Sequence, residues 1–151
     1  MKKIYLIITL VFTTLNGASP YPVFSENGMV VSTSRQASET GVEIMKKGGN
    51  AVDAAVATGF VLAVTSSSNG NIGGGGFMVI YDEDSNDTYA IDYREKAPAA
   101  SFKDMYLDEN GEFDILKSTF GYNAIGVPGT VHGFWNVHKR FGSLPWADLI
   151  Q

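Results

Sequence analysis

Arg94 is the residue of this chain whose type and setting best suit the binding of a small ligand. Arg94 directly follows the largely apolar stretch Thr88–Tyr93. An earlier apolar stretch, Phe77–Tyr81, directly follows four consecutive glycines, Gly73–Gly76. A guanidinium binds a carboxylate through two parallel hydrogen bonds, and glycines let backbone or ligand approach closely. The pattern indicates a carboxylate-binding site at Arg94, with a structural ion pair to Glu95 or Asp92 as the alternative.

A hairpin is the element that must position this arginine. Phe77–Tyr81 is short, apolar and rich in aromatic residues, which predicts a buried strand. The polar cluster Asp82–Asp87 is a turn signal, and Thr88–Tyr93 has the pattern of the returning strand. Arg94 is then expected at a strand end, a rigid place from which a side chain can meet a ligand.

Other site chemistries find little support. The glycine run lacks the Gly-Lys-Ser/Thr ending of a phosphate loop, so close backbone packing is the expected role of most of its glycines. The acidic turn lacks the spacing of an EF-hand. The chain has no cysteine, and the spacing of His132 and His138 does not make a same-face ligand pair. Ser66–Ser68 and His132 supply residue types of a catalytic triad, but no nucleophile elbow accompanies them.

The net charge is −5, and no basic run is longer than Lys2-Lys3. Proteins that bind nucleic acids by charge carry a basic patch or stripe. We therefore predict no nucleic-acid partner, and the residue types above predict neither a metal nor a cofactor.

Two helices are predicted before the glycine run. The hydroxyl of Thr33 or Ser34 is suited to cap the first one. Asn50 and Asp53 have the approximate spacing of a capping box at the start of the second. This second helix, Ala51–Val64, is almost wholly apolar, so it is expected to be buried on every face.

The remaining patterns are weaker. Residues 28–33 predict a first strand, residues 102–106 a short helix, and Thr130–Phe141 a longer helix with Gly142 as its C-cap. Residues 143–150 predict a further helix with a proline in its first turn. The chain then stops at Gln151 without a closing element, so we expect a fragment of a longer protein.

The N-terminus has the composition of an export signal. Lys2-Lys3 precedes an apolar core, Ile4–Leu15, that is too short to span a bilayer permanently, and small residues follow it. We expect residues 1–18 to be a signal peptide, 19–27 a linker and 28–151 a partial domain. The mature protein is expected in the periplasm or outside the cell, without stable membrane insertion.

Four segments resemble the signatures of the gamma-glutamyltransferase family in their order and spacing. They are Gly48–Ala57, Gly73–Met78, Asp92–Pro98 and Gly126–Gly129. The resemblance implies an α+β fold, the N-terminal-nucleophile hydrolase αββα sandwich, of which this chain holds the N-terminal portion of the large subunit. It covers the chain from Gly28 onward.

The resemblance also implies a function. Family members are proenzymes that cleave themselves into a large and a small subunit, and the new N-terminal threonine of the small subunit is the nucleophile. They transfer the gamma-glutamyl group of glutathione or related gamma-glutamyl compounds to water, an amino acid or a peptide. Arg94 matches the arginine that holds the substrate α-carboxylate. No residue of this chain matches the nucleophile or the oxyanion hole, so no catalytic residue is assigned here and the isolated chain is expected to be inactive.

Two other functions stay open from the sequence. One is a cephalosporin-type amide acylase of the same fold, because such acylases share these N-terminal motifs. The other is a non-catalytic exported fragment that binds amino acids through Arg94. The residues that follow Gln151 would separate the three.

Overall fold

The computed structural model describes residues 22–69 and 72–150. The predicted signal peptide, residues 1–18, therefore lies outside the described residues, as do the first three residues of the predicted linker. No helix within the described ranges is long and apolar enough to cross a membrane.

The first described helix, α2 (Arg35–Lys46), begins after Ser34, one of its two predicted caps. The side chain of Ser34 accepts a hydrogen bond from the backbone N–H of Ala37, at 3.4 Å. Lys46 lies in the last turn, where a cation interacts favourably with the helix dipole. Gly48 follows with φ at +95°, a left-handed conformation that glycine adopts without a steric penalty.

The second helix, α3 (Ala51–Thr65), carries the predicted capping box. The side chain of Asn50 accepts from the N–H groups of Val52 and Asp53, and the carboxylate of Asp53 accepts from the Asn50 N–H at 2.9 Å. The expectation that this helix is buried on every face is wrong. Its N-terminal half lies between α2 and α5, whereas its far end has few neighbours in the described chain, and Val64 is 82% exposed.

The predicted hairpin is present as β1 (Phe77–Asp82) and β2 (Asp87–Asp92), which pair antiparallel with Phe77 opposite Asp92. The prediction that Phe77–Tyr81 is a buried strand is wrong. One face of β1, with Met78 and Ile80, packs against the core, while the alternate residues Phe77, Val79 and Tyr81 are exposed. An apolar run cannot show which face of a strand finds a cover, because both faces carry similar residues.

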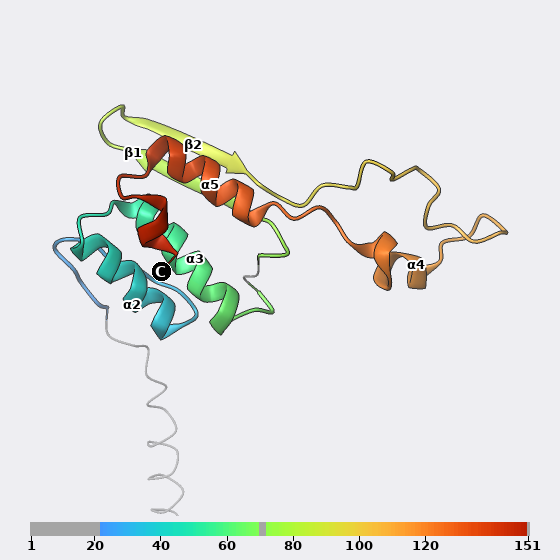
Figure 1. Cartoon of the computed structure of the whole chain (residues 1–151), viewed down its shortest axis with the longest axis horizontal. Helices are drawn as coiled ribbons and strands as arrows, with labels where there is room; N and C mark the ends of the chain where they lie inside the picture. The colour runs from blue at the N-terminus through green and yellow to red at the C-terminus, as the bar shows by residue number, and fades with distance from the viewer. Residues whose placement is uncertain (1–21, 70–71, 151) are drawn as a thin grey trace, which may run out of the picture.

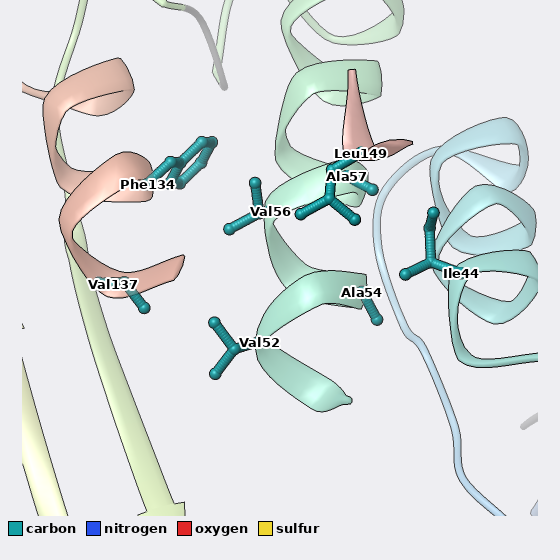
Figure 2. Packing of buried hydrophobic residues seen from close by; sticks show 8 residues of the cluster. All are labelled: Ile44, Val52, Ala54, Val56, Ala57, Phe134, Val137 and Leu149. Carbon is teal, nitrogen blue, oxygen red and sulfur yellow. The ribbon is translucent and has the colours of Figure 1, made fainter. Parts of the chain in front are cut away.

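The helix α5 (Thr130–Phe141) runs alongside the hairpin, where it contacts β2, and it also contacts α3. Gly142 is its C-cap, as predicted. The core forms where α5, α3 and α2 meet (Figure 2). In that view Val52 and Val56 of α3 point toward α5, and Ile44 of α2 points toward α3. The short 3-10 helix η2 (Trp146–Leu149) adds Leu149 to this core.

Three further predictions need correction. Residues 28–33 form no strand, because no strand in the described chain pairs with them; Val30 instead packs against the core. Residues 103–106 form a turn where a helix was predicted for 102–106. The predicted helix over 143–150 is reduced to η2, which follows Pro145.

Between β2 and α5 the chain leaves the body of the molecule and returns (Figure 1). We call residues 97–126 the arm; it contains the short helices α4 (Ile115–Thr119) and η1 (Tyr122–Ala124). Its base is closed by Lys96 and Val127, whose backbone groups exchange hydrogen bonds of 3.2 and 2.8 Å. The body consists of α2, α3, the hairpin, α5 and η2.

Candidate functional site

Arg94 lies where β2 ends, as the sequence predicts. The N–H of Tyr93 still donates to the Gly76 carbonyl at 2.9 Å, which continues the pairing of the hairpin by one residue. The N–H of Arg94 turns instead to the side chain of Asp92, at 3.0 Å. Arg94 is therefore the first residue after the sheet, and its backbone is anchored by the preceding carboxylate.

The side chain of Arg94 has one acidic neighbour. Its Nε lies 3.6 Å from Oε2 of Glu95, and the two side chains are 63% and 37% exposed. This is the ion pair that the sequence offered as the structural alternative. An exposed pair of this kind contributes little to stability. Within the described part of the chain Arg94 makes no second ion pair, so donors of its guanidinium remain open to a ligand.

A cleft of about 630 Å³ lies beside this arginine. It is lined by the end of β2 and the residues after it, by Val127–Gly129 at the start of α5, and by one face of α5 itself. Its charged groups include both signs, since Arg94 and Lys96 line it together with Asp92 and Glu95. A small zwitterion carries both charges and suits such a lining better than a simple anion does.

Sequence reasoning missed two residues of this cleft. His132 and Asn136 stand one turn apart on α5 and both line it. Their side chains contact each other, with Asn136 Nδ2 3.1 Å from Nε2 of His132. The spacing of four residues, which places two side chains on one face of a helix, was the available signal. Only the packing of α5 against β2 shows that this face lines the same cleft as Arg94.

The structure separates the two histidines. His138 is nearly buried at the other end of α5, where its Nε2 donates to the Leu144 carbonyl at 2.8 Å and lies 3.6 Å from the carboxylate of Asp53. The cleft that holds His132 does not include Ser66–Ser68, so no serine–histidine pair forms there. No group of three or more potential metal ligands gathers within residues 22–69 and 72–150.

Within the glycine run, Gly75 packs closely against the backbone of the same segment, the role that was predicted for most of these glycines. A Cβ atom on Gly75 would stand 2.7 Å from the Cα of Arg94. The ring of Tyr93 packs beside Gly76 and edge-on to Phe134, with 5.8 Å between ring centres. Burial raises the pKa of the Tyr93 phenol, because the charged phenolate is disfavoured away from water.

Comparison with known proteins shows the family to which this chain belongs. The family model for gamma-glutamyltranspeptidase matches residues 37–151. The glutathione hydrolase proenzyme of Pseudomonas aeruginosa is 50% identical over 133 residues, which are 88% of this chain and 24% of that protein. The chain therefore belongs to the gamma-glutamyltranspeptidase family, and it spans about a quarter of the length of this relative.

Solved structures agree with that assignment. The gamma-glutamyltranspeptidase of Helicobacter pylori is similar with a TM-score of 0.81 and 45% identity, over 85% of this chain and 37% of that one. A cephalosporin acylase from Bacillus halodurans is similar with a TM-score of 0.64 and 23% identity, over 89% of this chain and 26% of that one, and at this identity it shows the fold alone. The chain thus has the N-terminal portion of the α+β N-terminal-nucleophile hydrolase fold.

Proposed function

We propose that the protein carrying this chain is a gamma-glutamyltransferase and glutathione hydrolase. It would take the gamma-glutamyl group of glutathione or related compounds and pass it to water, an amino acid or a peptide. Support comes from the family membership and from the names of the relatives, which are glutathione hydrolases. The likeness to the cephalosporin acylase concerns the fold only, so no acylase function is proposed.

The chemistry would run through an acyl-enzyme on a threonine outside these 151 residues. The hydroxyl oxygen of the threonine bonds to the gamma-carbonyl carbon, the amide C–N bond breaks, and the leaving amine takes up a proton. Water or an amine then attacks the ester and releases the threonine. The threonine would be the first residue of a small subunit formed by self-cleavage of the precursor, a step suggested by the proenzyme name of the Pseudomonas relative.

The role proposed for this chain is to hold the substrate through Arg94. One observation carries the assignment: the arginine of the family motif stands at a strand end, with donors of its guanidinium open to a cleft lined by both charge signs. The gamma-glutamyl moiety presents an α-carboxylate and an α-ammonium group. Arg94 would bind the carboxylate with its fork of donors, and a carboxylate such as Glu95 suits the ammonium.

Arg94→Ala in the full-length protein tests this assignment. Substrate binding should weaken by about 2–5 kcal/mol once a covered carboxylate loses its partner, and Arg94→Lys should weaken it less. The loss should appear mainly as a raised KM for glutathione, because the carboxylate contact exists in the ground state as well as in the transition state. Self-cleavage should continue, since the cut peptide bond does not use this contact.

Arg140→Ala is the matched control. Arg140 also lies near the end of its element, but its guanidinium stacks 4.4 Å from the ring centre of Tyr89 and does not line the cleft. This variant should keep the wild-type KM. Wild-type kinetics in a matured Arg94→Ala protein would make Arg94 purely structural. Binding of glutathione without any turnover by the full-length wild type would favour the non-catalytic alternative.

We also propose export to the periplasm or cell exterior, with removal of residues 1–18. The charged start and apolar core of the N-terminus support this location. Mass spectrometry of the protein recovered from the exported fraction should find a terminus close to Ser19. A protein that retains Met1 in that fraction would contradict the cleavage.

A further inference from the structure

Two glycines from distant parts of the chain lie very close to the peptide groups that precede and follow the Cα atom of Arg94. A Cβ atom on Gly75 would stand 2.6 Å from the Tyr93 carbonyl oxygen and 2.7 Å from the Glu95 nitrogen. A Cβ atom on Gly129 would collide with the same Tyr93 oxygen and stand 2.9 Å from the Arg94 oxygen. Side chains essentially never approach backbone this closely, so only glycine fits either position as the segment now lies.

Hydrogen bonds connect the two glycine segments to each other and to β2. The N–H groups of Gly129 and Thr130 donate to the Gly74 carbonyl at 2.8 and 3.1 Å, and Gly76 accepts from Tyr93. Two residues after Arg94, the backbone groups of Lys96 and Val127 exchange two hydrogen bonds. The backbone around Arg94 is thus approached closely both by the glycine run and by the residue that precedes α5.

The need for glycine at these two positions is spatial. Four described glycines have positive φ, namely Gly28, Gly48, Gly111 and Gly121, and neither Gly75 nor Gly129 is among them. Gly129 has φ at −111°, which any residue can adopt. What excludes a side chain is therefore the close approach of the Arg94 segment and not the conformation of the glycine.

We propose that Gly75 and Gly129 are positioning residues that act as a backbone clamp on Arg94; this inference rests on the proposed function. The direction of a long side chain depends on the position and orientation of its own backbone. A contact in which a guanidinium makes two hydrogen bonds to a carboxylate tolerates little misplacement. A methyl group at either glycine would move the Tyr93–Glu95 backbone and turn the guanidinium away from the substrate carboxylate.

The test uses Gly75→Ala and Gly129→Ala in the full-length protein, with a gamma-glutamyl anilide as substrate. A displacement of about 1 Å costs on the order of 10²-fold in a positioned reaction, so KM should rise roughly 10- to 100-fold while kcat falls less. Gly41→Ala is the control, because its Cβ would meet Thr58 Oγ1 at 2.5 Å in the contact between α2 and α3. That variant should lose thermal stability and keep the wild-type KM.

A double-mutant cycle with Arg94→Ala separates positioning from general loosening. If the glycines act through Arg94, Gly129→Ala should raise KM little further once the arginine is absent. Additive effects would overturn the clamp, as would wild-type KM in both glycine variants. Failure of both glycine variants to mature, where Gly41→Ala matures, would also overturn it, since the glycines would then serve the fold.

The outcomes distinguish the clamp from the function on which it rests. No turnover of the anilide by the wild type would remove the proposed function and the clamp together. Wild-type kinetics in Arg94→Ala would remove the substrate role of Arg94. A raised KM in Arg94→Ala with unchanged KM in both glycine variants would leave the proposed function standing and remove the clamp alone.

Discussion

The body and the arm of this chain are held in shape by different means. The body has a core of apolar side chains from α2, α3, α5 and η2, several of them fully buried. In the arm, residues 97–126, no residue is buried, and Phe120 and Tyr122 are 72% and 93% exposed. Both regions nevertheless have defined local structure.

The arm is ordered by polar contacts. The carboxylate of Asp108 accepts from the N–H groups of Asn110 and Glu112 at 2.8 and 2.9 Å. Lys117 Nζ donates to the Leu107 carbonyl at 2.6 Å, and the Tyr106 hydroxyl donates to the Asn123 carbonyl at 2.7 Å. Turn chemistry therefore shapes a segment without a core, while exposed hydrogen bonds add little to its resistance to unfolding.

An Asp→Asn substitution in each region should give the largest difference in the free energy of unfolding between body and arm. Asp53 is fully buried, and its carboxylate accepts from the backbone of Asn50, from the backbone and hydroxyl of Ser143, and from the backbone of Leu144. Asp53→Asn replaces one acceptor oxygen with a donor that faces other donors, so the free energy of unfolding should fall by about 3 kcal/mol. Urea unfolding of the chain from residue 22 measures it.

Asp108→Asn is the counterpart in the arm. Backbone N–H groups lower the pKa of the Asp108 carboxyl, first that of Glu112, but the side chain is open to water. Both backbone N–H groups donate to the same oxygen, Oδ1, and an asparagine amide keeps that acceptor, so the urea midpoint should not change measurably. An equal loss in the two variants would break the distinction between body and arm.

Truncation of apolar side chains should give the next largest contrast. Val56 is fully buried in α3, so Val56→Ala should reduce the free energy of unfolding by about 2 kcal/mol through lost burial and an added cavity. Phe120→Ala removes a larger side chain from the arm and should cost less than about 0.5 kcal/mol in the same chain. A larger cost for Phe120→Ala in the full-length protein would show that the rest of the protein covers the arm.

The smallest expected effect is on the pH dependence of the unfolding free energy. It concerns Tyr93, which lies in the body close to the base of the arm. The folded pKa of Tyr93 is raised by burial above the ordinary value of 10.0. Its contribution to stability is therefore fully present below pH 10 and is lost as the pH rises through the folded pKa, because the unfolded chain releases the proton first. Tyr93→Phe should flatten the fall of unfolding free energy above pH 10. Superimposable alkaline profiles for the two proteins would contradict the prediction.

Local signals in the sequence determined much of the body. Caps at Ser34 and Asn50, the capping box with Asp53 and the glycine after α5 each act through neighbouring residues. The start of α2 and both ends of α3 and α5 were therefore predicted within one or two residues. The hairpin and the place of Arg94 at its end were predicted for the same reason. The resemblance to the family motifs added the proposed substrate class, which the periodicity of the sequence does not contain.

Tertiary structure alone decided which of these elements are covered. Residues 28–33 have strand composition but find no partner strand among residues 22–69 and 72–150. The far end of α3 is apolar but has few neighbours in the same ranges, because pairing and burial depend on segments distant in sequence. That His132 and Asn136 line the same cleft as Arg94 depends on the packing of α5 on β2. The approach of Gly75 and Gly129 to one peptide brings together two separate glycine motifs, and only the folded backbone shows that both are needed for the space around Arg94.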